Sequence, residues 1–520
     1  MSANTTGTVY LLGAGPGDPE LITMKARHLL VSADAVVYDN LVADELVVTL
    51  PATIERYYVG KRPGSVCNSQ EDINALLVRL AKEGKTVARL KGADPLIFGR
   101  GGEEARFLRE HGIPFVIVPG ITAGIAAPAY AGIPCTDRER ASYVVFATGH
   151  PSREKSASSV PWDWVAQATT GTVVIYMGVA QAEDVMRRLT NAGMPPDHPA
   201  AVIERGTYPT QRVVKSTVAE LPRAMKREHI KAPAIIILGR VIEVQPWLRW
   251  WDNLPLMGKR ILVTRPVHQA HDMYQSLREL GAEVMPYPTI TVNEHHDRKV
   301  WDHFLALERD GWLVFTSENG VNFFMKQFFE HVDDVRSLAR FKLAVIGTGT
   351  MRALEQYHLR PDFVPTKQTG EGFAEELVRF ADFNGVNVVR VRGNLAFSNV
   401  EDALRDVGAH VITLTTYNTE LNTWSPDHKE ALLERPPDII TFTSGTTCDG
   451  LLENLTTEEL RQVTGSAIIA SIGPTTTRTV EAHGMTVTIE PNTHSIPALI
   501  DAIVQHASSA APGTNKGEES

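Results

Sequence analysis

Short apolar runs alternate with segments of helical period along the first 120 residues. The runs are "TVYLLG", "AVVYD", "ERYYVG", "TVARL" and "PFVIV". Between them, segments such as "EDINALLVRLAKEG" repeat apolar positions every three to four residues, as one face of a helix does. Strands that alternate with helices in this way predict a mostly parallel sheet with helices on its faces.

The same α/β pattern continues to about residue 245 with "YVVFATGH", "TVVIYMG", "AVIERG" and "APAIIILGRVI". We therefore expect two α/β domains, over residues 7–120 and 121–245. The stretch "EVQPWLRWWDNLPLMG" that follows is rich in Trp and Pro and fits neither period. We interpret residues 246–257 as an inter-domain linker whose tryptophans can pack against the two halves.

The second half opens with the strand pattern "KRILVTRP" and contains an internal repeat, called the echo below, in which a similar pair of motifs occurs twice. "FTSENGV" is followed about thirty residues later by "VIGTGT", and "FTSGTT" is followed at nearly the same interval by "SIGPTT". This repetition predicts two related α/β lobes, each with a hydroxyl-rich turn between strand and helix. Because "RILVTRP" needs a sheet and "TLTTYNTEL" suggests a return crossing, the lobes are not expected to be consecutive. The polar, small-residue tail 508–520 is predicted to be disordered.

Composition narrows the class of protein. The 520 residues carry a net charge of −10 without a basic tract, which argues against a general nucleic-acid binder. The three cysteines lie far apart, which indicates a reducing compartment with neither disulfides nor a zinc site. The N-terminus lacks a signal-peptide pattern and no apolar run could span a bilayer. We therefore expect a cytoplasmic protein that binds no metal, nucleic acid or membrane.

The turn "GAGPGDPEL" lies between the first predicted strand and the first predicted helix. Gly13 and Gly15 fit a dinucleotide fingerprint, but Asp18 stands where its third glycine would be, and Pro16 stiffens the turn. A carboxylate at this helix N-terminus occupies the place of a pyrophosphate. No Gly-Lys-Ser/Thr follows, so a Walker loop is also excluded. The turn predicts a ligand without phosphates.

Other candidate residues follow the remaining predicted strands, whose carboxyl ends should converge on one edge of the sheet. The whole set is Gly13, Gly15, Pro16, Asp18, Asp39, Lys61, Lys91, Gly92, Ala93, Asp94, Pro119, Gly120, Thr122 and Ala123. Taken singly, each has a plainer explanation, such as helix caps for Asp18 and Asp94. Their convergence on one edge favours a binding site.

Residues 7 to about 250 resemble the uroporphyrinogen-III C-methyltransferases of the tetrapyrrole methylase family. The motifs that carry the resemblance are "GAGPGDPELITMKA", "VVYDNLV", "VGKRPG", "VARLKGADPLIFGRGGEE", "VPGITA", "YMG" and "ERGT". The resemblance implies two α/β domains with S-adenosyl-L-methionine bound in the cleft between them, S-adenosyl-L-homocysteine as a product, and a homodimer formed through this half.

The resemblance also assigns residues. It implies that the cofactor is bound by Pro16, Gly92, Ala93, Asp94, Ile97, Thr122, Ala123, Met177 and Gly206. Asp39 takes the position of the proton acceptor and Lys61 that of the proton donor. The substrate carries eight carboxylates, for which the candidate forks are Arg62, Arg89, Arg100 and Arg138. The alternative for each arginine is a solvated surface position without a role in binding. The chain departs from the family at Ala93, where glycine is usual, and at Val66, where relatives often carry His.

Residues 258–507 resemble uroporphyrinogen-III synthase through "ILVTRP", "FTSENGV", "VIGTGT", "TTYNTE", "FTSGTT" and "SIGPTT". The resemblance implies a bilobed α/β fold joined by a β-ladder, with lobe one at 258–290 and 418–507 and lobe two at 291–417. Candidate substrate-binding residues are Thr316, Ser317, Thr348, Ser444, Thr475 and Thr476. Tyr417 is the candidate for assisting hydroxide departure, with a structural strand aromatic as the alternative.

Together the resemblances imply a bifunctional enzyme of tetrapyrrole biosynthesis. The second half would cyclise hydroxymethylbilane to uroporphyrinogen III, and the first half would methylate this product at C2 and C7 to give precorrin-2, for sirohaem or cobalamin. The alternative is a methyltransferase whose second half senses a tetrapyrrole without catalysis, because two-lobed α/β modules also serve as sensors.

Overall fold

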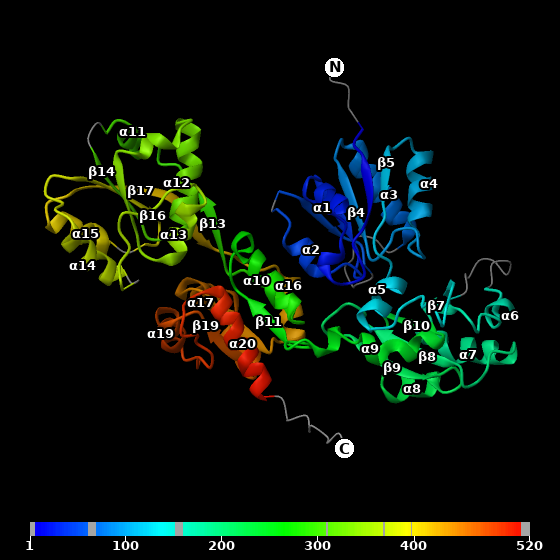
Figure 1. Cartoon of the computed structure of the whole chain (residues 1–520). Helices are drawn as coiled ribbons and strands as arrows, with labels where there is room; N and C mark the ends of the chain where they lie inside the picture. Colours follow the sequence, from blue (N-terminus) through cyan, green and yellow to red (C-terminus); the bar gives the residue numbers. More distant parts are fainter. Residues whose placement is uncertain are drawn as a thin grey trace.

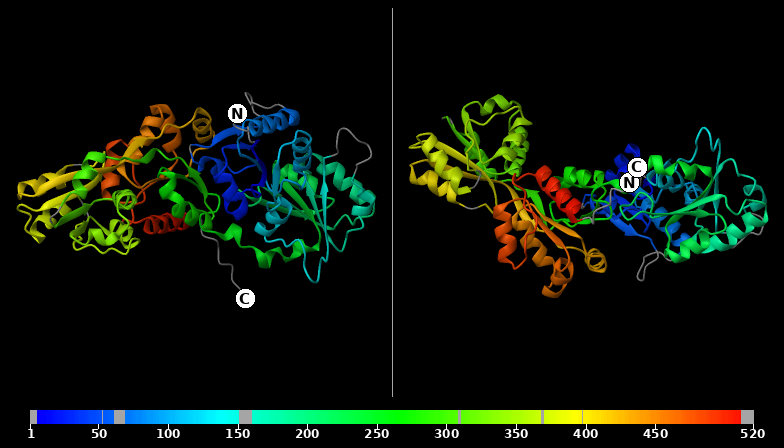
Figure 2. Two further views of the ribbon diagram at one scale, coloured as in Figure 1. Left: turned by 90° about the horizontal axis from the view of Figure 1, so that it is seen from above. Right: turned by 60° about the horizontal axis from the view of Figure 1, so that its bottom comes forward.

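The computed structural model of the chain describes residues 6–51, 53–60, 69–150, 160–307, 310–367, 370–396 and 398–510. Helices and strands alternate around four sheets, two in each half of the chain (Figure 1). In both views of Figure 2 the first half and the second half lie side by side. The predicted α/β class, with two domains followed by a bilobed unit, is confirmed.

The first sheet is wholly parallel, with the order β3-β2-β4-β1-β5. Its strands are β1 (Val9–Gly13), β2 (Ala35–Tyr38), β3 (Glu55–Tyr58), β4 (Val87–Lys91) and β5 (Phe115–Val118). Its helices are α1 (Met24–Val31), α2 (Asp44–Val48), α3 (Gln70–Lys82) and α4 (Gly101–Glu110), with the 3₁₀ turn η1 (Pro19–Leu21) after β1. Leu11 packs into one apolar core with α3 and α4, whereas Leu12 packs into another with α1 and α2. Helices therefore bury both faces, and the loops after the strands meet at one edge.

The second sheet is mixed, with the order β6-β7-β10-β8-β9, in which the pair β6–β7 is parallel and the other pairs are antiparallel. Its strands are β6 (Val144–Thr148), β7 (Thr172–Tyr176), β8 (Pro199–Glu204), β9 (Arg212–Thr217) and β10 (Ala234–Leu238). Its helices are α5 (Ala123–Tyr130), α6 (Trp162–Val165), η2 (Val179–Gln181), α7 (Ala182–Asn191) and α8 (Leu221–Arg227). Strand β9 was not predicted, because its "RVVKST" pattern is that of a half-exposed edge strand rather than a buried run.

The connecting segment is a series of short helices: η3 (Arg240–Val244), α9 (Gln245–Leu248) and η4 (Trp251–Asn253). The rings of Trp250 and Trp251 pack on Tyr130 at centroid distances of 5.1 and 4.8 Å. The indole N–H of Trp250 donates to the Ala129 carbonyl at 3.2 Å. These tryptophans therefore fasten the segment to the second domain.

One lobe of the second half is discontinuous in sequence, and its parallel sheet has the order β12-β11-β18-β19. Its elements are β11 (Arg260–Val263), α10 (Val267–Glu279), β12 (Glu283–Pro286), α16 (Pro426–Glu434), β18 (Ile439–Phe442), α17 (Gly445–Asn454), α18 (Thr457–Thr464), β19 (Ile468–Ser471), α19 (Pro474–Ala482) and α20 (Ile496–Ala510). Helix α20 reaches Ala510, so residues 508–510 are helical, contrary to the expected start of a disordered tail at 508. Residues 511–520 lie outside the described part of the chain.

The other lobe is inserted between β12 and β18 and has the sheet order β13-β17-β16-β14-β15. Its elements are β13 (Ile290–Glu294), α11 (Arg298–Leu305), β14 (Gly311–Phe315), α12 (Glu318–His331), η5 (Val335–Leu338), β15 (Phe341–Val345), α13 (Thr348–Glu355), α14 (Gly370–Phe380), β16 (Asn387–Gly393), α15 (Asn399–Asp406) and β17 (His410–Leu421). β13 leaves the first lobe and pairs antiparallel with the returning end of β17. These two strands form the ladder that joins the lobes.

The sequence echo corresponds to a structural repeat. In one lobe β14 leads through α12 to β15, and in the other β18 leads through α17 to β19, with parallel pairing in both. Each second strand then makes a parallel bridge to a residue further along the chain, Ala344 to Phe363 and Ala470 to Ile489.

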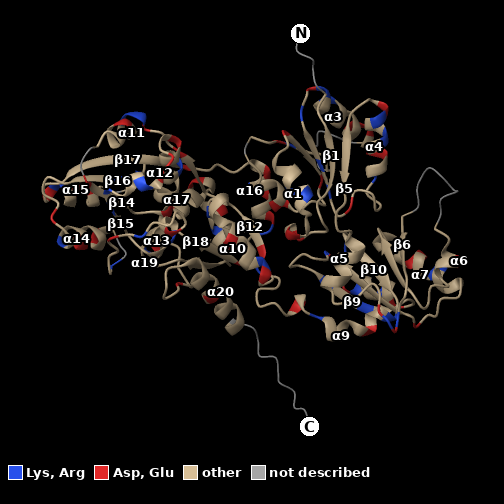
Figure 3. Cartoon of the chain, turned by 45° about the horizontal axis from the view of Figure 1, so that its top comes forward, with Lys and Arg blue, Asp and Glu red and all other residues tan. Residues whose placement is uncertain are grey.

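Charged side chains of both signs are spread over both halves (Figure 3). Among the helices of the described residues, none has both the length and the apolar character needed to cross a membrane.

A half-buried histidine makes the discontinuous lobe sensitive to acid. The His428 ring stacks on Tyr287 at a centroid distance of 4.0 Å, and burial lowers its pKa from 6.5 to about 4. The unfolded chain therefore binds a proton on this residue at a higher pH than the folded chain. The stability that neutral His428 contributes is present above about pH 6.5 and is lost as the pH falls toward 4.

We expect His428→Phe, which keeps an aromatic ring and cannot be protonated, to reduce the loss of unfolding free energy between pH 6.5 and 4.5. Chemical denaturation at a series of pH values measures this. His271→Phe, at an exposed position in α10 of the same lobe, serves as the control and should keep the parental acid dependence. Equal acid dependence in the His428 variant and the parent would contradict the prediction.

Candidate active sites

Three loops of the first domain approach one another at the carboxyl edge of its sheet. The Ala93 N–H donates to the Gly15 carbonyl at 2.7 Å, which ties the loop after β4 to the loop after β1. A Cβ on Gly120 would lie 2.3 Å from the Ala93 oxygen, and a Cβ on Gly13 would lie 2.5 Å from the Gly120 Cα. Only glycine at positions 13 and 120 permits this approach.

Asp94 fixes the same junction with its side chain. One carboxylate oxygen accepts the Gly120 N–H at 3.0 Å, and the other accepts the N–H groups of Leu96 and Ile97 at 2.8 and 3.1 Å. The carboxylate thus holds the loops after β4 and β5 together. Both explanations offered for Asp94 from the sequence, a local cap and a site residue, are compatible with this position.

Backbone strain is concentrated around these loops. Of the eight non-glycine residues with positive φ in the described part of the chain, six lie in the segments that follow β4, β7 and β8. They are Ala93, Phe98, Arg100, Met177, Arg205 and Thr207, with φ between 47° and 71°. Such strain persists only where surrounding structure enforces it, and it clusters at functional sites. The usual family glycine at position 93 is explained, because Ala93 adopts a left-handed conformation at φ 59°.

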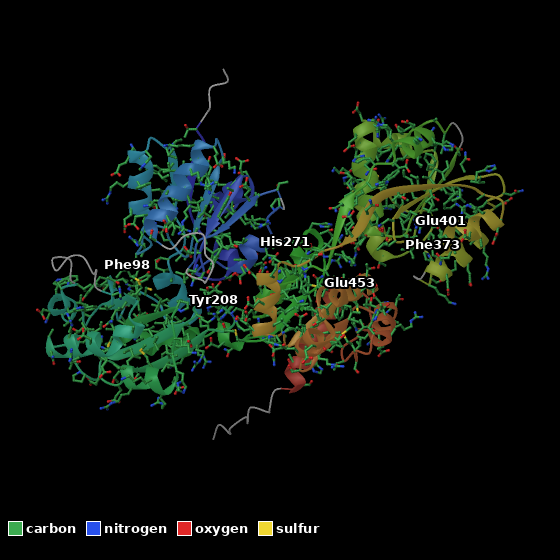
Figure 4. The ribbon with its side chains drawn as sticks, turned by 180° about the vertical axis from the view of Figure 1, so that it is seen from behind. Phe98, Tyr208, His271, Phe373, Glu401 and Glu453 are labelled. Atoms are coloured by element: carbon green, nitrogen blue, oxygen red, sulfur yellow. The ribbon has the colours of Figure 1, made fainter. Side chains whose placement is uncertain are left out.

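Tyr176, at the end of β7, binds the start of α5, which directly follows the loop after β5 of the first domain. Its hydroxyl shares a 2.7 Å hydrogen bond with the Thr122 hydroxyl and accepts the Gly124 N–H at 2.8 Å. Burial raises the pKa of Tyr176, so the phenol is neutral. The Phe98 ring lies 4.9 Å from that of Tyr176, between the two domains (Figure 4). Gly206 lies against α5, because a Cβ there would be 2.2 Å from the Ala127 Cβ.

An apolar surface remains exposed at this junction. Its members come from loops of both domains and from α5, and they are 36–53% exposed: Leu96, Ile97, Phe98, Ile121, Ile125 and Met177. Pro16 and Ala123 beside them are half-buried. Large side chains exposed in such a group mark a surface that a partner or ligand covers.

A buried charge cluster supports Asp39, which follows β2. The Arg89 guanidinium donates to Asp39 at 3.0 Å and to Glu104 at 3.3 Å, and the Lys91 ammonium donates to Glu104 at 2.9 Å. Glu104 is fully buried, and burial together with Arg89 lowers the pKa of Lys91. The Asp39 carboxylate is 23% exposed. It is oriented by the Arg89 guanidinium, whose positive charge is balanced on the buried side by Glu104.

The predicted substrate arginines differ in position. Arg89 is 3% exposed and its guanidinium is committed to Asp39 and Glu104, so it is placed to support Asp39 rather than to grip a substrate carboxylate directly. Arg100 and Arg138 are exposed, and Arg100 forms a two-bond ion pair with Glu103. Lys61 and Arg62 lie outside the described residues.

In the second half a cavity of about 440 Å³ lies between the two lobes. Among the residues predicted from the sequence, Ser317, Thr348, Tyr417 and Ser444 line it. The Tyr417 and Ser317 hydroxyls share a hydrogen bond of 3.0 Å. The cavity therefore brings together residues from β14, α13, β17 and β18 that are far apart in the sequence.

Helix N-termini give this cavity a positive character. Ser317 caps α12 by accepting the Gly320 N–H at 3.0 Å, and Ser444 caps α17 by accepting the Thr447 N–H at 3.3 Å. The first turns of both helices line the cavity, one from each lobe. Backbone N–H groups at a helix start favour anions, and carboxylates in particular.

Three predicted residues lie outside the cavity lining. The Thr316 hydroxyl accepts from the buried Arg390 at 2.6 Å, which holds it within its own lobe. Thr476 is buried in α19 and Thr475 is exposed beside it. The echo placed these two threonines by analogy with the turn after β15, but in this lobe His494 reaches the cavity instead.

Arg265 is a cavity residue that the sequence analysis missed. It follows β11, lines the cavity, and has a buried Nε without a hydrogen-bond partner among the described residues. Burial lowers its pKa, and Glu318 opposes that shift. The motif "VTRP" places Arg265 at a strand end, so the rule applied to the strand ends of the first half would have found it.

Within the described residues no group of three or more His, Cys, Asp or Glu could hold a metal ion.

The close approach of the three loops can be tested at Gly120. We expect Gly120→Ala to lower the unfolding free energy by about 1–3 kcal/mol, because its Cβ meets the backbone oxygen of Ala93. Gly102→Ala is the matched control, since nothing lies within 4 Å of a Cβ there and the residue belongs to helix α4. Urea denaturation should show a loss for the first variant and none for the second. Equal stability of the two variants would count against the contact.

Comparison with known proteins assigns both halves. Residues 8–222 match the family described as Tetrapyrrole (Corrin/Porphyrin) Methylases, and residues 271–501 match that described as Uroporphyrinogen-III synthase HemD. The porphyrin biosynthesis protein HemD of Ruminiclostridium josui is 37% identical over 466 residues, which cover 89% of this chain and 92% of the relative.

Two further relatives match the first half. The S-adenosyl-L-methionine-dependent uroporphyrinogen III methyltransferase of Methanosarcina barkeri is 49% identical over 47% of this chain and 95% of its own length. The siroheme synthase of Azotobacter vinelandii is 50% identical over 48% of this chain, which spans about half (53%) of that relative. The chain therefore belongs to the HemD porphyrin biosynthesis family, with a tetrapyrrole methylase region followed by a uroporphyrinogen-III synthase region.

Proposed function

We propose that the chain converts hydroxymethylbilane to precorrin-2 with two successive activities. The second half closes the linear tetrapyrrole to uroporphyrinogen III. The first half methylates that product at C2 and C7 with S-adenosyl-L-methionine, releasing S-adenosyl-L-homocysteine, on the route to sirohaem or cobalamin. The relatives named above, a uroporphyrinogen III methyltransferase that depends on S-adenosyl-L-methionine among them, support the methylase substrate and the methyl donor.

The exposed apolar surface at the junction of the first two domains is the observation that carries the methylase part. It offers apolar cover for a nucleoside and for the pyrrole rings of a tetrapyrrole, while the Asp18 carboxylate stands where a phosphate would bind. The residues present thus fit S-adenosyl-L-methionine, which supplies an electrophilic methyl group on its sulfonium. We assign its binding to Pro16, Gly92, Ala93, Asp94, Ile97, Thr122, Ala123, Met177 and Gly206.

The residues of the first half act mainly by positioning. The rigid loops at Gly13, Ala93 and Gly120 hold the two reactants in register, which is the largest contribution expected for a methyl transfer. Asp39, oriented by Arg89, accepts the proton that the methylated ring must lose, and Lys61 is the proposed donor. The exposed Arg100 and Arg138 are placed to bind substrate carboxylates.

The residues of the second half act by folding a polyanionic substrate. The N-termini of α12 and α17, together with Arg265, hold carboxylates on both walls of the cavity. The Tyr417 hydroxyl, hydrogen-bonded to Ser317, donates to the departing hydroxide. Thr348 and Ser444 supply further hydroxyl groups within the same cavity.

The proposal is tested by anaerobic turnover of freshly made hydroxymethylbilane, with and without S-adenosyl-L-methionine, followed by isomer-resolved chromatography and mass spectrometry. We expect uroporphyrinogen III without the methyl donor and a product two methyl groups heavier with it. Formation of the spontaneous type I isomer alone, with methylation of added uroporphyrinogen III intact, would identify the second half as a sensor instead.

The role of Tyr417 is tested by Tyr417→Phe, which keeps the ring stacked on Phe323 and removes the hydroxyl. We expect kcat for cyclisation to fall by about 10²–10³, as for loss of a general acid, with methylation of added uroporphyrinogen III unchanged. Tyr357→Phe, in the same lobe but outside the cavity lining, is the matched control. An unchanged rate in the Tyr417 variant would leave this tyrosine with a structural role only.

A further inference from the structure

An arginine of the second half is bound between two loops of the first half. Arg278, near the end of α10, donates through Nη1 to Glu20 at 3.1 Å and through Nε to Glu45 at 3.1 Å, and its Nη2 also pairs with Glu45. The Arg278 side chain is 11% exposed and that of Glu45 is 15% exposed. The contact is therefore a half-buried fork rather than a solvated surface pair, a geometry that arginine provides and lysine does not.

The two carboxylates belong to the loops that form the methylase site. Glu20 lies in η1, directly after the turn that contains Pro16 and Asp18. Glu45 lies in the first turn of α2, which follows Asp39. Arg278 thus connects the loop after β1 to the loop after β2 from outside the first half.

The loop after β1 is held on its other side by the second domain. The Tyr130 hydroxyl donates to Asp18 at 2.6 Å, and the Asp18 N–H donates to the Thr207 hydroxyl at 3.0 Å. The Tyr208 ring packs against Gly17, and Figure 4 places Tyr208 beside the point where the two halves meet. These contacts hold the loop after β1 from the side of the second domain, and Arg278 holds the same loop from the side of the second half.

The charges at this contact matter because the proposed substrate is a polyanion. Glu20 and Glu45 place two negative charges beside the loops that we assign to the binding of this substrate. Arg278 neutralises part of this charge. Its removal leaves Glu45 without an ion-pair partner among the described residues, and leaves Glu20 only the charge of Arg27. This compensation comes from the second half of the same chain.

We propose that the second half serves the methylase as a positioning element, in which Arg278 orders the loops after β1 and β2 and offsets the charges of Glu20 and Glu45 so that a polycarboxylate tetrapyrrole can bind. Arg278 is a positioning residue, since it acts through these loops. The inference rests on the proposed function for the identity of the substrate. It goes beyond that function by making methylation depend on a residue of the synthase half.

The test is Arg278→Gln in the full chain, assayed for methylation of added uroporphyrinogen III. We expect KM for this substrate to rise by about fivefold at low salt, with kcat unchanged and a smaller effect at high ionic strength. The triple variant Arg278→Gln, Glu20→Gln, Glu45→Gln should recover most of the affinity, because it removes the uncompensated charges. Arg405→Gln, which breaks a surface pair with Asp402, is the control and should leave KM unchanged.

Amide hydrogen exchange supplies a readout that does not need activity. Peptides covering residues 13–23 and 39–48 should exchange faster in Arg278→Gln than in the wild type or in Arg405→Gln. Unchanged exchange, an unchanged KM, or a loss of kcat that the triple variant does not rescue would each overturn the inference. If the wild-type chain transfers no methyl group, the proposed function fails, and exchange alone still decides whether Arg278 orders the loops.

Discussion

The proposed methylase site depends on the contact of three backbones at Gly13, Ala93 and Gly120. Carboxyl ends of parallel strands converge, but they reach van der Waals contact only where side chains are absent. Ala93 meets this demand with a strained left-handed backbone rather than with glycine. Asp94 then bonds two of the loops to each other. Rigidity at this edge is what a methyl transfer needs, since its rate depends on alignment of the reactants.

Beneath that edge the charged side chains form one connected network rather than separate ion pairs. Glu104 is buried, which is tolerable only because Arg89 and Lys91 both donate to it. Arg89 in turn orients Asp39 at the surface of the site. For Asp39, which we propose as the base, this support fixes the direction of the carboxylate from its buried side. The arginine therefore contributes by orientation, a role that its burial explains.

Much of this arrangement could be predicted from the sequence, because the relevant patterns are local. Apolar runs defined β1 to β5, and their ends singled out Asp39 and Asp94 as candidate site residues. The commitment of Arg89 to Glu104, the edge strand β9 and the exposed Thr475 could not be predicted, because each depends on which distant elements pack together. In the second half the echo located Ser317 and Ser444 correctly at the cavity, whereas analogy failed after β19, where His494 replaces the threonines.

Joining the two halves in one chain does more than produce them in equal amounts, because it also has a physical consequence for the methylase half. The connecting segment is bonded through Trp250 and Trp251 to the second domain, so it holds the following lobe near the loops of the first domain. A single guanidinium placed at that boundary then faces two carboxylates that were already part of the methylase loops. Because each carboxylate belongs to a different loop, the contact constrains both loops at once. Covalent linkage lowers the entropic cost of that contact, since the partner is always present at high effective concentration.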